Sequence, residues 1–242
     1  MSAQALKRWA KAGRSPLARR VFTLAKALRG AAMPSVPAIH APLYAARIAT
    51  LGALAGAKRS LWTTPLLKSR IETPAPGLYV YGGMPLILGN LRIRAGRDVR
   101  ISGQTTISGR ASARATPLLD IGSNVDIGWQ TTIAVAGRIV IGDNVRIAGR
   151  AFLAGYPGHP LDPADRAAGL PETDDQCGDI VLERDVWLAT GVTVLPGVTI
   201  GQGTVVGAGS VVTKDLPPFV LAAGSPARVV RTITPKERID VA

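Results

Sequence analysis

The amino-acid sequence predicts an all-β repeat protein: a coil of short parallel strands, preceded by a basic, helix-rich segment and followed by a short extension. Two observations predict the coil: an aliphatic residue returns at every sixth position, and small residues or glycines follow many of these aliphatic residues. A third observation distinguishes the N-terminal segment from the coil, since all excess positive charge lies in the first 71 residues. We expect three parts, residues 1–85, 86–216 and 217–242, with the coil in the middle part.

The N-terminal segment carries the whole excess of charge. The net charge is +13, and residues 1–71 hold thirteen basic residues and no acidic one, so the remainder of the chain is formally neutral. An imbalance of this kind informs about binding partners and not about the fold.

Residues 4–30 place apolar side chains at spacings of three and four. This pattern predicts two short amphipathic helices, broken near Ser15 and Pro16 and ended by Gly30. One interpretation is that the helices pack on the rest of the protein. The other is that residues 1–30 lie on an anionic membrane, at the inner face, with their cations toward the headgroups. No nucleic-acid motif accompanies the charge, so we expect no nucleic-acid partner.

Cysteine and histidine counts bound the chemistry. The single cysteine, Cys177, has no partner for an internal disulfide, and one cysteine with two histidines is too few for an ordinary zinc site. No apolar run reaches the length of a membrane-spanning helix, and basic residues recur as far as Arg29, unlike a signal peptide. We therefore expect a cytoplasmic protein without a bound metal.

The coil is predicted by a six-residue period, which is neither the 3.6 of a helix nor the 2 of a simple strand. Three hexads make one turn of a coil in which short strands send aliphatic residues inward and small residues allow the chain to bend. The five predicted coils place inward residues at 95/101/107, 121/127/133, 141/147/153, 182/188/194 and 200/206/212.

One coil boundary holds a long excursion, which we place at residues 154–181. The hexad after Leu153 falls at residue 159, which is 23 residues before Leu182. His159 lies in this excursion, and a long loop that interrupts a repeat is usually functional. His159 is therefore the catalytic candidate, with a surface histidine as the alternative. His40 has no such context, and we expect it to be structural or exposed.

Four stretches carry a resemblance to a known family: "IGDNVRIAG" (141–149), "GHPLDPADR" (158–166), residues 185–217 and "AAGSPARVVR" (222–231). Together they resemble the hexapeptide-repeat acyltransferases, and within these the maltose and galactoside O-acetyltransferases, over roughly residues 90–232. The resemblance implies a left-handed parallel β-helix of about five coils, a homotrimer with active sites in the clefts between subunits, and acetyl-CoA as donor co-substrate without a metal.

The resemblance also implies roles for single residues. His159, followed by proline, matches the general base that removes the proton of the attacking hydroxyl, a task that suits imidazole near neutral pH. Asp162, Asp165 and Arg166 match residues that order the loop. The donor residues that match are Thr190, Gly207 and Ala208 along the pantetheine arm, Thr213 and Lys214 near the adenine and phosphate end, and Arg228 and Arg231 at the nucleotide phosphates.

The acceptor side departs from the maltose-type relatives. They carry an asparagine before an aromatic residue where this chain has "IGWQTT" (127–132), so Trp129 and Gln130 are candidates for acceptor contact, with packing as the alternative. The small donor-site residues also have an alternative as plain turn residues, and the cations as solvated side chains.

The leading hypothesis is an acetyl-CoA-dependent O-acetyltransferase that acts on a sugar hydroxyl in surface polysaccharide or glycolipid assembly. The alternatives are N-acetylation of an amino sugar, acetylation of a xenobiotic, and a non-catalytic β-helix scaffold. A γ-type carbonic anhydrase of the same fold needs three histidine ligands, and this chain has two histidines. A covalent relay through Cys177 is disfavoured, because that residue lies outside every matched motif.

Overall fold

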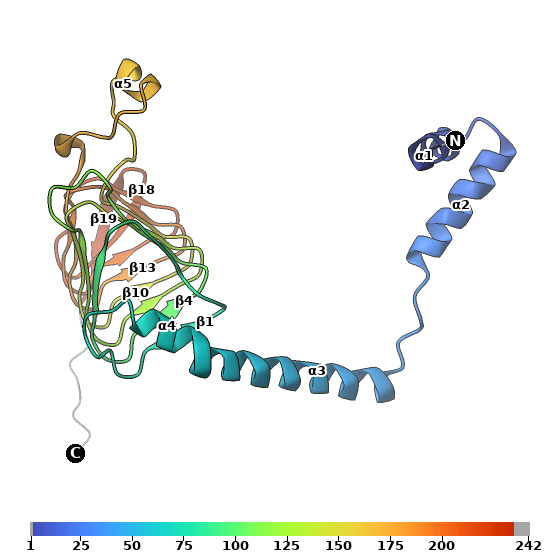
Figure 1. Ribbon diagram of the computed structural model, residues 1–242, viewed down its shortest axis with the longest axis horizontal. Helices are drawn as coiled ribbons and strands as arrows, with labels where there is room; N and C mark the ends of the chain where they lie inside the picture. Colours follow the sequence, from blue (N-terminus) through green and yellow to red (C-terminus); the bar gives the residue numbers. More distant parts are fainter. Residues whose placement is uncertain (1, 235–242) are drawn as a thin grey trace. The chain divides into compact units, whose positions relative to one another are not determined.

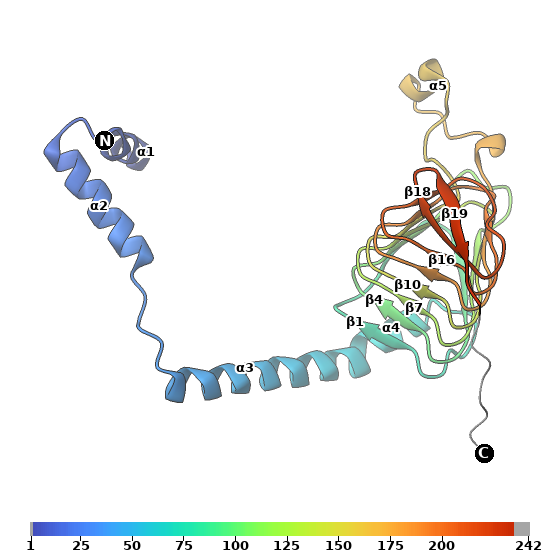
Figure 2. The same ribbon diagram turned by 180° about the vertical axis from the view of Figure 1, so that it is seen from behind.

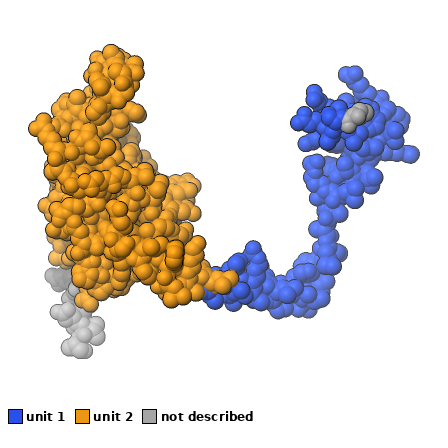
Figure 3. Space-filling view, in the orientation of Figure 1, with its two compact units in different colours: residues 1–53 blue, residues 54–242 orange. Residues whose placement is uncertain are grey.

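The computed structural model of the protein describes residues 2–234 (Figures 1 and 2). The chain divides into two compact units, residues 1–53 and residues 54–242, which Figure 3 distinguishes by colour. The first unit is helical, and the second contains the strands.

The first unit begins with the two expected helices, α1 (Ala3–Ala12) and α2 (Pro16–Gly30). Ser2 and Ser15 cap them, since each side-chain oxygen accepts a hydrogen bond from a backbone N–H of the first turn. Gly13 ends α1 in the left-handed conformation, with φ of 62°. The sequence prediction of two helices broken before the proline is confirmed.

A third helix, α3 (Pro37–Lys58), continues through a short π-helix, Arg59–Thr63, into the short helix α4 (Thr64–Lys68). None of the residues of α3 is buried. Within residues 2–234, no helix combines the length and apolar character that a membrane crossing requires.

The strands of the second unit form three sheets, and the chain visits them in rotation. The first sheet contains β1 (Tyr79–Tyr81), β4 (Arg100–Ser102), β7 (Asp126–Ile127), β10 (Arg146–Ile147), β13 (Trp187–Leu188), β16 (Val205–Val206), β18 (Val220–Gly224) and β19 (Ala227–Thr232). The second contains β2 (Leu86–Leu88), β5 (Thr106–Gly109), β8 (Thr132–Val135), β11 (Phe152–Ala154), β14 (Thr193–Val194) and β17 (Val211–Val212). The third contains β3 (Arg92–Ala95), β6 (Leu118–Ile121), β9 (Arg138–Ile141), β12 (Ile180–Leu182) and β15 (Thr199–Ile200).

The strand register confirms all five predicted coils. In the first sheet Ile101, Ile127, Ile147, Leu188 and Val206 are paired in turn, in parallel. The columns 107/133/153/194/212 and 95/121/141/182/200 pair in the same way in the second and third sheets. These columns form the core, and most of their members are fully buried.

The coil extends further at both ends than the sequence indicated. Its first strand, β1, pairs with β4, so the parallel structure begins at Tyr79 and not at residue 86. At the other end, β18 pairs with β16 in parallel, and only β19 then runs antiparallel. Val80 and Ile87 are seven residues apart, which breaks the six-residue period and hides this first coil in the sequence.

Three rows of turns join the sheets. We call them the first corner (first sheet to second), the second corner (second to third) and the third corner (third to first). The predicted excursion leaves from the second corner, between β11 and β12, and contains the helix α5 (Pro163–Ala167) and the short 3-10 helix Asp174–Gln176. Figure 1 shows α5 standing away from the stacked strands.

A ladder of side-chain hydrogen bonds runs along the third corner. Asn124 Nδ2 donates to Asn144 Oδ1 at 2.8 Å, and Asn144 Nδ2 donates to Asp185 Oδ1 at 2.8 Å. All three residues have left-handed backbone, with φ between 54° and 63°. Asparagine and aspartate tolerate that conformation better than other side chains do, so the turn shape and the ladder favour the same residues.

We predict that Asn144→Ala lowers the free energy of unfolding by about 2–3 kcal/mol, from two lost hydrogen bonds and the left-handed backbone. Asn144→Gly loses the hydrogen bonds alone and should be about 1 kcal/mol more stable than the alanine variant. Denaturant unfolding of the three proteins checks this. Equal stability of the alanine and glycine variants would contradict it.

Candidate functional site

The first corner aligns the predicted acceptor residues with part of the predicted donor site. The N–H of Arg150 donates to Trp129 O at 2.8 Å, that of Gly191 to Gly149 O at 3.0 Å, and that of Gly209 to Thr190 O at 2.9 Å. Four successive turns are thereby stacked. Trp129 and Gln130, Thr190, and Gly207 with Ala208 lie along this single line, although they span residues 129 to 208 of the chain.

Arg150 organises the acceptor end of the first corner. Its guanidinium carbon lies 4.7 Å from the ring centroid of Trp129, and its Nε donates to Gln130 Oε1 at 3.3 Å. A Cβ at Gly149 would lie 2.7 Å from Trp129 Nε1, so a glycine is required for the indole to lie where it does. Trp129 stays 43% exposed. Its ring is therefore available to a ligand as well as packed on the cation.

The donor end of the first corner is lined by small, accessible residues. Thr190 and Ala208 are exposed, and a Cβ at Gly207 would lie 3.1 Å from Ala223 Cβ. Ala223 pairs with Arg228 across the β18–β19 hairpin, which brings that arginine to the same end of the coil. Arg231 pairs with Leu221 further along the hairpin. A thin chain can lie along this corner against the backbone, with cations beyond it.

Two of the predicted donor residues lie at a different corner. Thr213 and Lys214 follow β17, the last strand of the second sheet, and are therefore at the second corner. Both side chains are exposed. The second corner is also where the excursion leaves, so they share a corner with His159 and not with Thr190.

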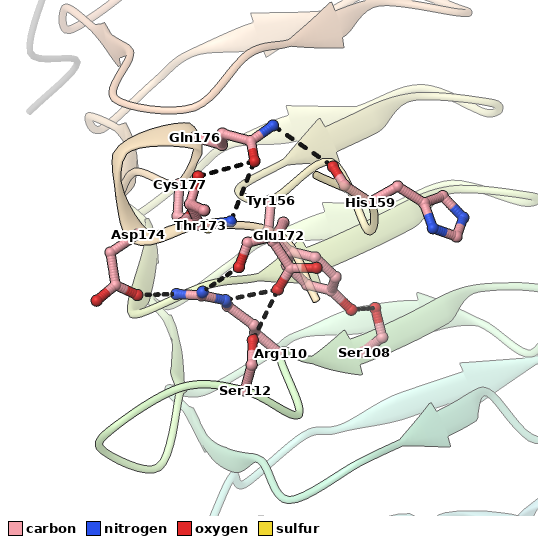
Figure 4. Close-up of polar contacts among 10 residues, drawn as sticks. All are labelled: Ser108, Arg110, Ser112, Tyr156, His159, Glu172, Thr173, Asp174, Gln176 and Cys177. Carbon is pink, nitrogen blue, oxygen red and sulfur yellow. Dashed lines mark hydrogen bonds and ion pairs between the residues drawn. The ribbon is translucent and has the colours of Figure 1, made fainter. Parts of the chain in front are cut away.

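His159 is exposed on the excursion and lines a cavity of about 730 Å³. The cavity is bounded by the second sheet, through Leu88 and Ser108, and by the excursion, through Tyr156 and Glu172. The backbone carbonyl of His159 accepts a hydrogen bond from Gln176 Nε2 at 3.4 Å, while the ring points away from the polar cluster in Figure 4. The imidazole is thus presented outward from a supported backbone.

Asp162 and Arg166 stabilise the outer part of the excursion through hydrogen bonds to its backbone. Asp162 Oδ1 accepts hydrogen bonds from the N–H groups of Ala164 and Asp165, which caps α5. Arg166 donates to the carbonyls of Pro160 and Leu161. Asp162 and Arg166 therefore serve as the loop-ordering residues that the sequence predicted.

A buried ion pair holds the excursion to the coil. Arg110 Nε donates to Glu172 Oε1 at 2.6 Å, and its Nη1 donates to Asp174 Oδ1 at 2.7 Å (Figure 4). Ser112 Oγ donates to the same Glu172 oxygen at 2.8 Å. The side chains of Arg110 and Glu172 are 8% and 6% exposed. We call Arg110, Ser112, Glu172 and Asp174 the loop anchor.

The outgoing limb of the excursion is held separately, because the Tyr156 hydroxyl donates to Ser108 Oγ at 2.8 Å. With the loop anchor on the returning limb, one limb beside His159 is fixed to β5 of the second sheet and the other to the second corner. Neither contact was predicted from the sequence. One signal was present: Ile107 and Ile121 are fourteen residues apart, so an eight-residue insertion that contains Arg110 breaks the period there.

The electrostatics keep the loop anchor charged at neutral pH. Burial raises the pKa of Glu172, but the hydrogen bonds from Arg110 and Ser112 outweigh it, and the pKa lies below its usual value. The hydrogen bond from Arg110 also lowers the pKa of Asp174. A carboxyl whose pKa falls on folding stabilises the fold above its unfolded pKa, and this stabilisation is lost as the pH falls through the folded pKa. The anchor is therefore complete at neutral pH and weakens only in acid.

Two remaining candidates lie outside this arrangement. His40 is in α3, where its Nδ1 contacts the backbone of Val36. Cys177 donates to Thr173 O at 3.4 Å, and burial raises the pKa of its thiol, so the protonated form is favoured. Across residues 2–234, no three His, Cys, Asp or Glu side chains gather in a group that could hold a metal ion.

We predict that Arg110→Ala destabilises the protein by about 3–5 kcal/mol, because it leaves the Glu172 carboxylate buried without its partner. Arg114→Ala is the matched control: it removes the same charge from an exposed pair with Asp174 and should cost about 0–1 kcal/mol. Thermal unfolding, together with limited proteolysis within residues 155–179, measures both effects. Equal losses in the two variants would rule out the buried pair as the anchor.

Comparison with known proteins identifies the repeat. The family described as bacterial transferase hexapeptide (six repeats) matches residues 179–214. The galactoside O-acetyltransferase of Escherichia coli K12 is 37% identical over 123 residues, 48% of this chain and 58% of that protein. Nodulation protein L of Rhizobium meliloti is 43% identical over 112 residues, 46% of this chain and 58% of that protein. The chain spans less than two thirds of the length of these curated relatives.

A solved structure shares the fold. The N-acyltransferase AntD from Bacillus cereus, in complex with dTDP and 3-hydroxybutyryl-CoA, is 21% identical with a TM-score of 0.55, over 71% of this chain and 88% of that chain. At this identity the likeness concerns the fold alone. The predicted fold class, a left-handed parallel β-helix, is confirmed. The predicted resemblance to the hexapeptide-repeat acyltransferases is confirmed by the family match and by the galactoside O-acetyltransferase.

Proposed function

Since the chain carries the hexapeptide repeat of bacterial transferases, we propose that it is an acetyl-CoA-dependent O-acetyltransferase whose acceptor is a sugar hydroxyl. The names of its relatives support this, as galactoside O-acetyltransferase and polysialic acid O-acetyltransferase both modify sugars. The CoA ester recorded for the Bacillus structure supports a CoA thioester as donor. We place the reaction in surface polysaccharide or glycolipid assembly, at the cytoplasmic face of a membrane.

The observation that carries the proposal of a site shared between copies of the chain is the chemistry of the second sheet. Its strands contain no Asp, Glu, Lys or Arg, whereas the first sheet carries Arg100, Asp126 and Arg146, and the third carries Arg92 and Arg138. Leu86, Leu88 and Phe152 are also exposed on it. A flat, uncharged face with exposed apolar residues suits contact with further copies of the chain.

Packing of the second sheets of three chains around a three-fold axis would bring the two parts of the proposed site together. The second sheet runs from the first corner to the second, so three copies that turn this sheet to a common axis bring the second corner of each chain against the first corner of the next. His159 of one subunit then meets the line of Trp129, Thr190, Gly207 and Ala208 of its neighbour. The homotrimer supplies in one cleft what a single chain holds at two corners.

The chemistry in this cleft needs only one titrating group. The His159 imidazole accepts the hydroxyl proton as the sugar oxygen attacks the thioester carbonyl, a carbon–oxygen bond forms, and the carbon–sulfur bond breaks. The departing CoA sulfur then takes the proton from the imidazolium. Trp129 and Gln130 contact the acceptor, and the loop anchor holds the base in place.

The donor fits the accessible backbone of the first corner. Thr190, Gly207 and Ala208 border the pantetheine arm, and Arg228 and Arg231 bind the nucleotide phosphates as forked donors. In this arrangement Thr213 and Lys214 approach the donor from the neighbouring subunit, together with His159. No metal takes part in the proposed reaction.

We predict that His159→Ala lowers turnover about a hundredfold or more while CoA binding is unchanged, because a general base contributes about 10²–10⁴-fold. His40→Ala, which removes the other histidine, is the control and should keep full activity. Free-thiol release from acetyl-CoA is the assay, screened over sugars, amino sugars, nucleotide sugars and membrane glycolipid extract. Near wild-type turnover in His159→Ala would remove the histidine from the mechanism.

Mixed trimers test the shared cleft. His159→Ala lacks the base and Ala208→Phe blocks the donor arm, so each protein alone should be inactive. Mixed and reassembled in equal amounts, they should regain about one cleft in four, where an intact second corner meets an intact first corner. If each chain used its own two corners, no mixture would regain activity.

A further inference from the structure

The hairpin of α1 and α2 has almost no core of its own. Among its described residues, 2–30, only Ala10 and Ala18 are buried. Helices shorter than about 12–15 residues are marginal in water, so helices of 10 and 15 residues need a further surface to pack on. The large apolar side chains that remain exposed are Leu6, Trp9, Leu17, Phe22, Leu24 and Leu28.

Between the two helices lies an apolar groove of about 580 Å³. Leu6, Ala10, Val21, Phe22 and Ala25 form its apolar lining. The cations that border it are Lys7, Lys11, Lys26 and Arg29. Since residues 1–71 contain no acidic residue, no carboxylate of the first unit neutralises them. The groove therefore joins an apolar cavity to a positively charged rim, which matches a molecule with an apolar tail and an anionic head.

We propose that this hairpin is a docking site for an anionic phospholipid bilayer, in which an acyl chain enters the groove and the rim cations bind lipid phosphates. Both elements are needed, because stable attachment to a membrane usually takes an apolar insertion and a polybasic patch together. The bilayer supplies the apolar surface that the hairpin lacks.

The distribution of side chains favours a bilayer over other acidic partners. A nucleic acid would engage the cations and leave Leu6 and Phe22 in water. An acidic helix of another protein would fill the groove, but Leu17, Leu24 and Leu28 lie outside its lining and would stay exposed. A bilayer covers both sets and presents anionic charge around them.

The test is co-sedimentation of the full-length protein with vesicles of phosphatidylcholine alone, or of phosphatidylcholine with phosphatidylglycerol. We expect binding to the anionic vesicles only, weakened by salt. Leu6→Asn, inside the groove, should weaken binding about tenfold from the lost apolar burial. Leu51→Asn makes the same change at an exposed leucine of α3, outside the hairpin, and should leave binding nearly unchanged.

A second matched pair tests the rim. Lys7→Gln with Lys26→Gln should weaken binding about 25-fold, since each cation near an anionic surface contributes about fivefold. Lys58→Gln with Lys68→Gln removes the same charge outside the hairpin and should leave binding nearly unchanged. Circular dichroism and thermal unfolding of all variants check that the second unit is intact.

Three outcomes would overturn the proposal: no binding to anionic vesicles, equal binding to neutral vesicles, or equal effects within either matched pair. Retention of an acidic protein or a nucleic acid by a chain that ignores vesicles would assign the groove to that partner. Because sedimentation does not require turnover, the result stands apart from the acyltransferase proposal, which thiol release decides.

Discussion

The stacking of each coil on the next is the constraint from which the rest of the molecule follows. Parallel strands one coil apart exchange backbone hydrogen bonds in strict register, so a residue type that suits one coil suits the position above and below it. The inward positions become continuous columns of isoleucine, leucine and valine. The turns become straight rows for the same reason, and so Trp129 and Thr190 lie along one line.

That constraint explains which features the sequence could predict. A period of six residues fixes the register, and every column from Ala95 to Val212 follows from it. The same period also shows where the repeat is interrupted, and His159 was predicted as a catalytic candidate because it lies in such an interruption. The six-residue period does not predict contacts between the two segments that interrupt it. Arg110 and Glu172 are 62 residues apart, and each lies in a stretch that breaks the repeat, so nothing in the spacing joins them.

Sequence motifs also conceal which side of a coil a residue occupies. Thr213 and Lys214 are close in sequence to Gly207 and Ala208, yet one strand separates the two pairs, and one strand is a whole side of the triangular coil. The matched motifs indicated a common site, and the fold divides that site between two corners. The uncharged second sheet, which joins the first and second corners, suggests that the two corners meet between neighbouring copies of the chain. The contact of Arg150 with Trp129 was not predicted, because a cation that stacks on an indole ring produces no recognisable spacing in the sequence.

The antiparallel strand β19 has a consequence for solubility. A stack of parallel strands ends in an open edge, and such an edge can template another chain in the manner of a fibril. β19 covers part of the last coil in the opposite direction, and it carries Arg228 and Arg231 on a strand that is exposed over most of its length. A further parallel coil would meet the wrong strand polarity and two like charges. The residues proposed to hold nucleotide phosphates therefore also protect the edge of the first sheet against pairing with the coil of another molecule.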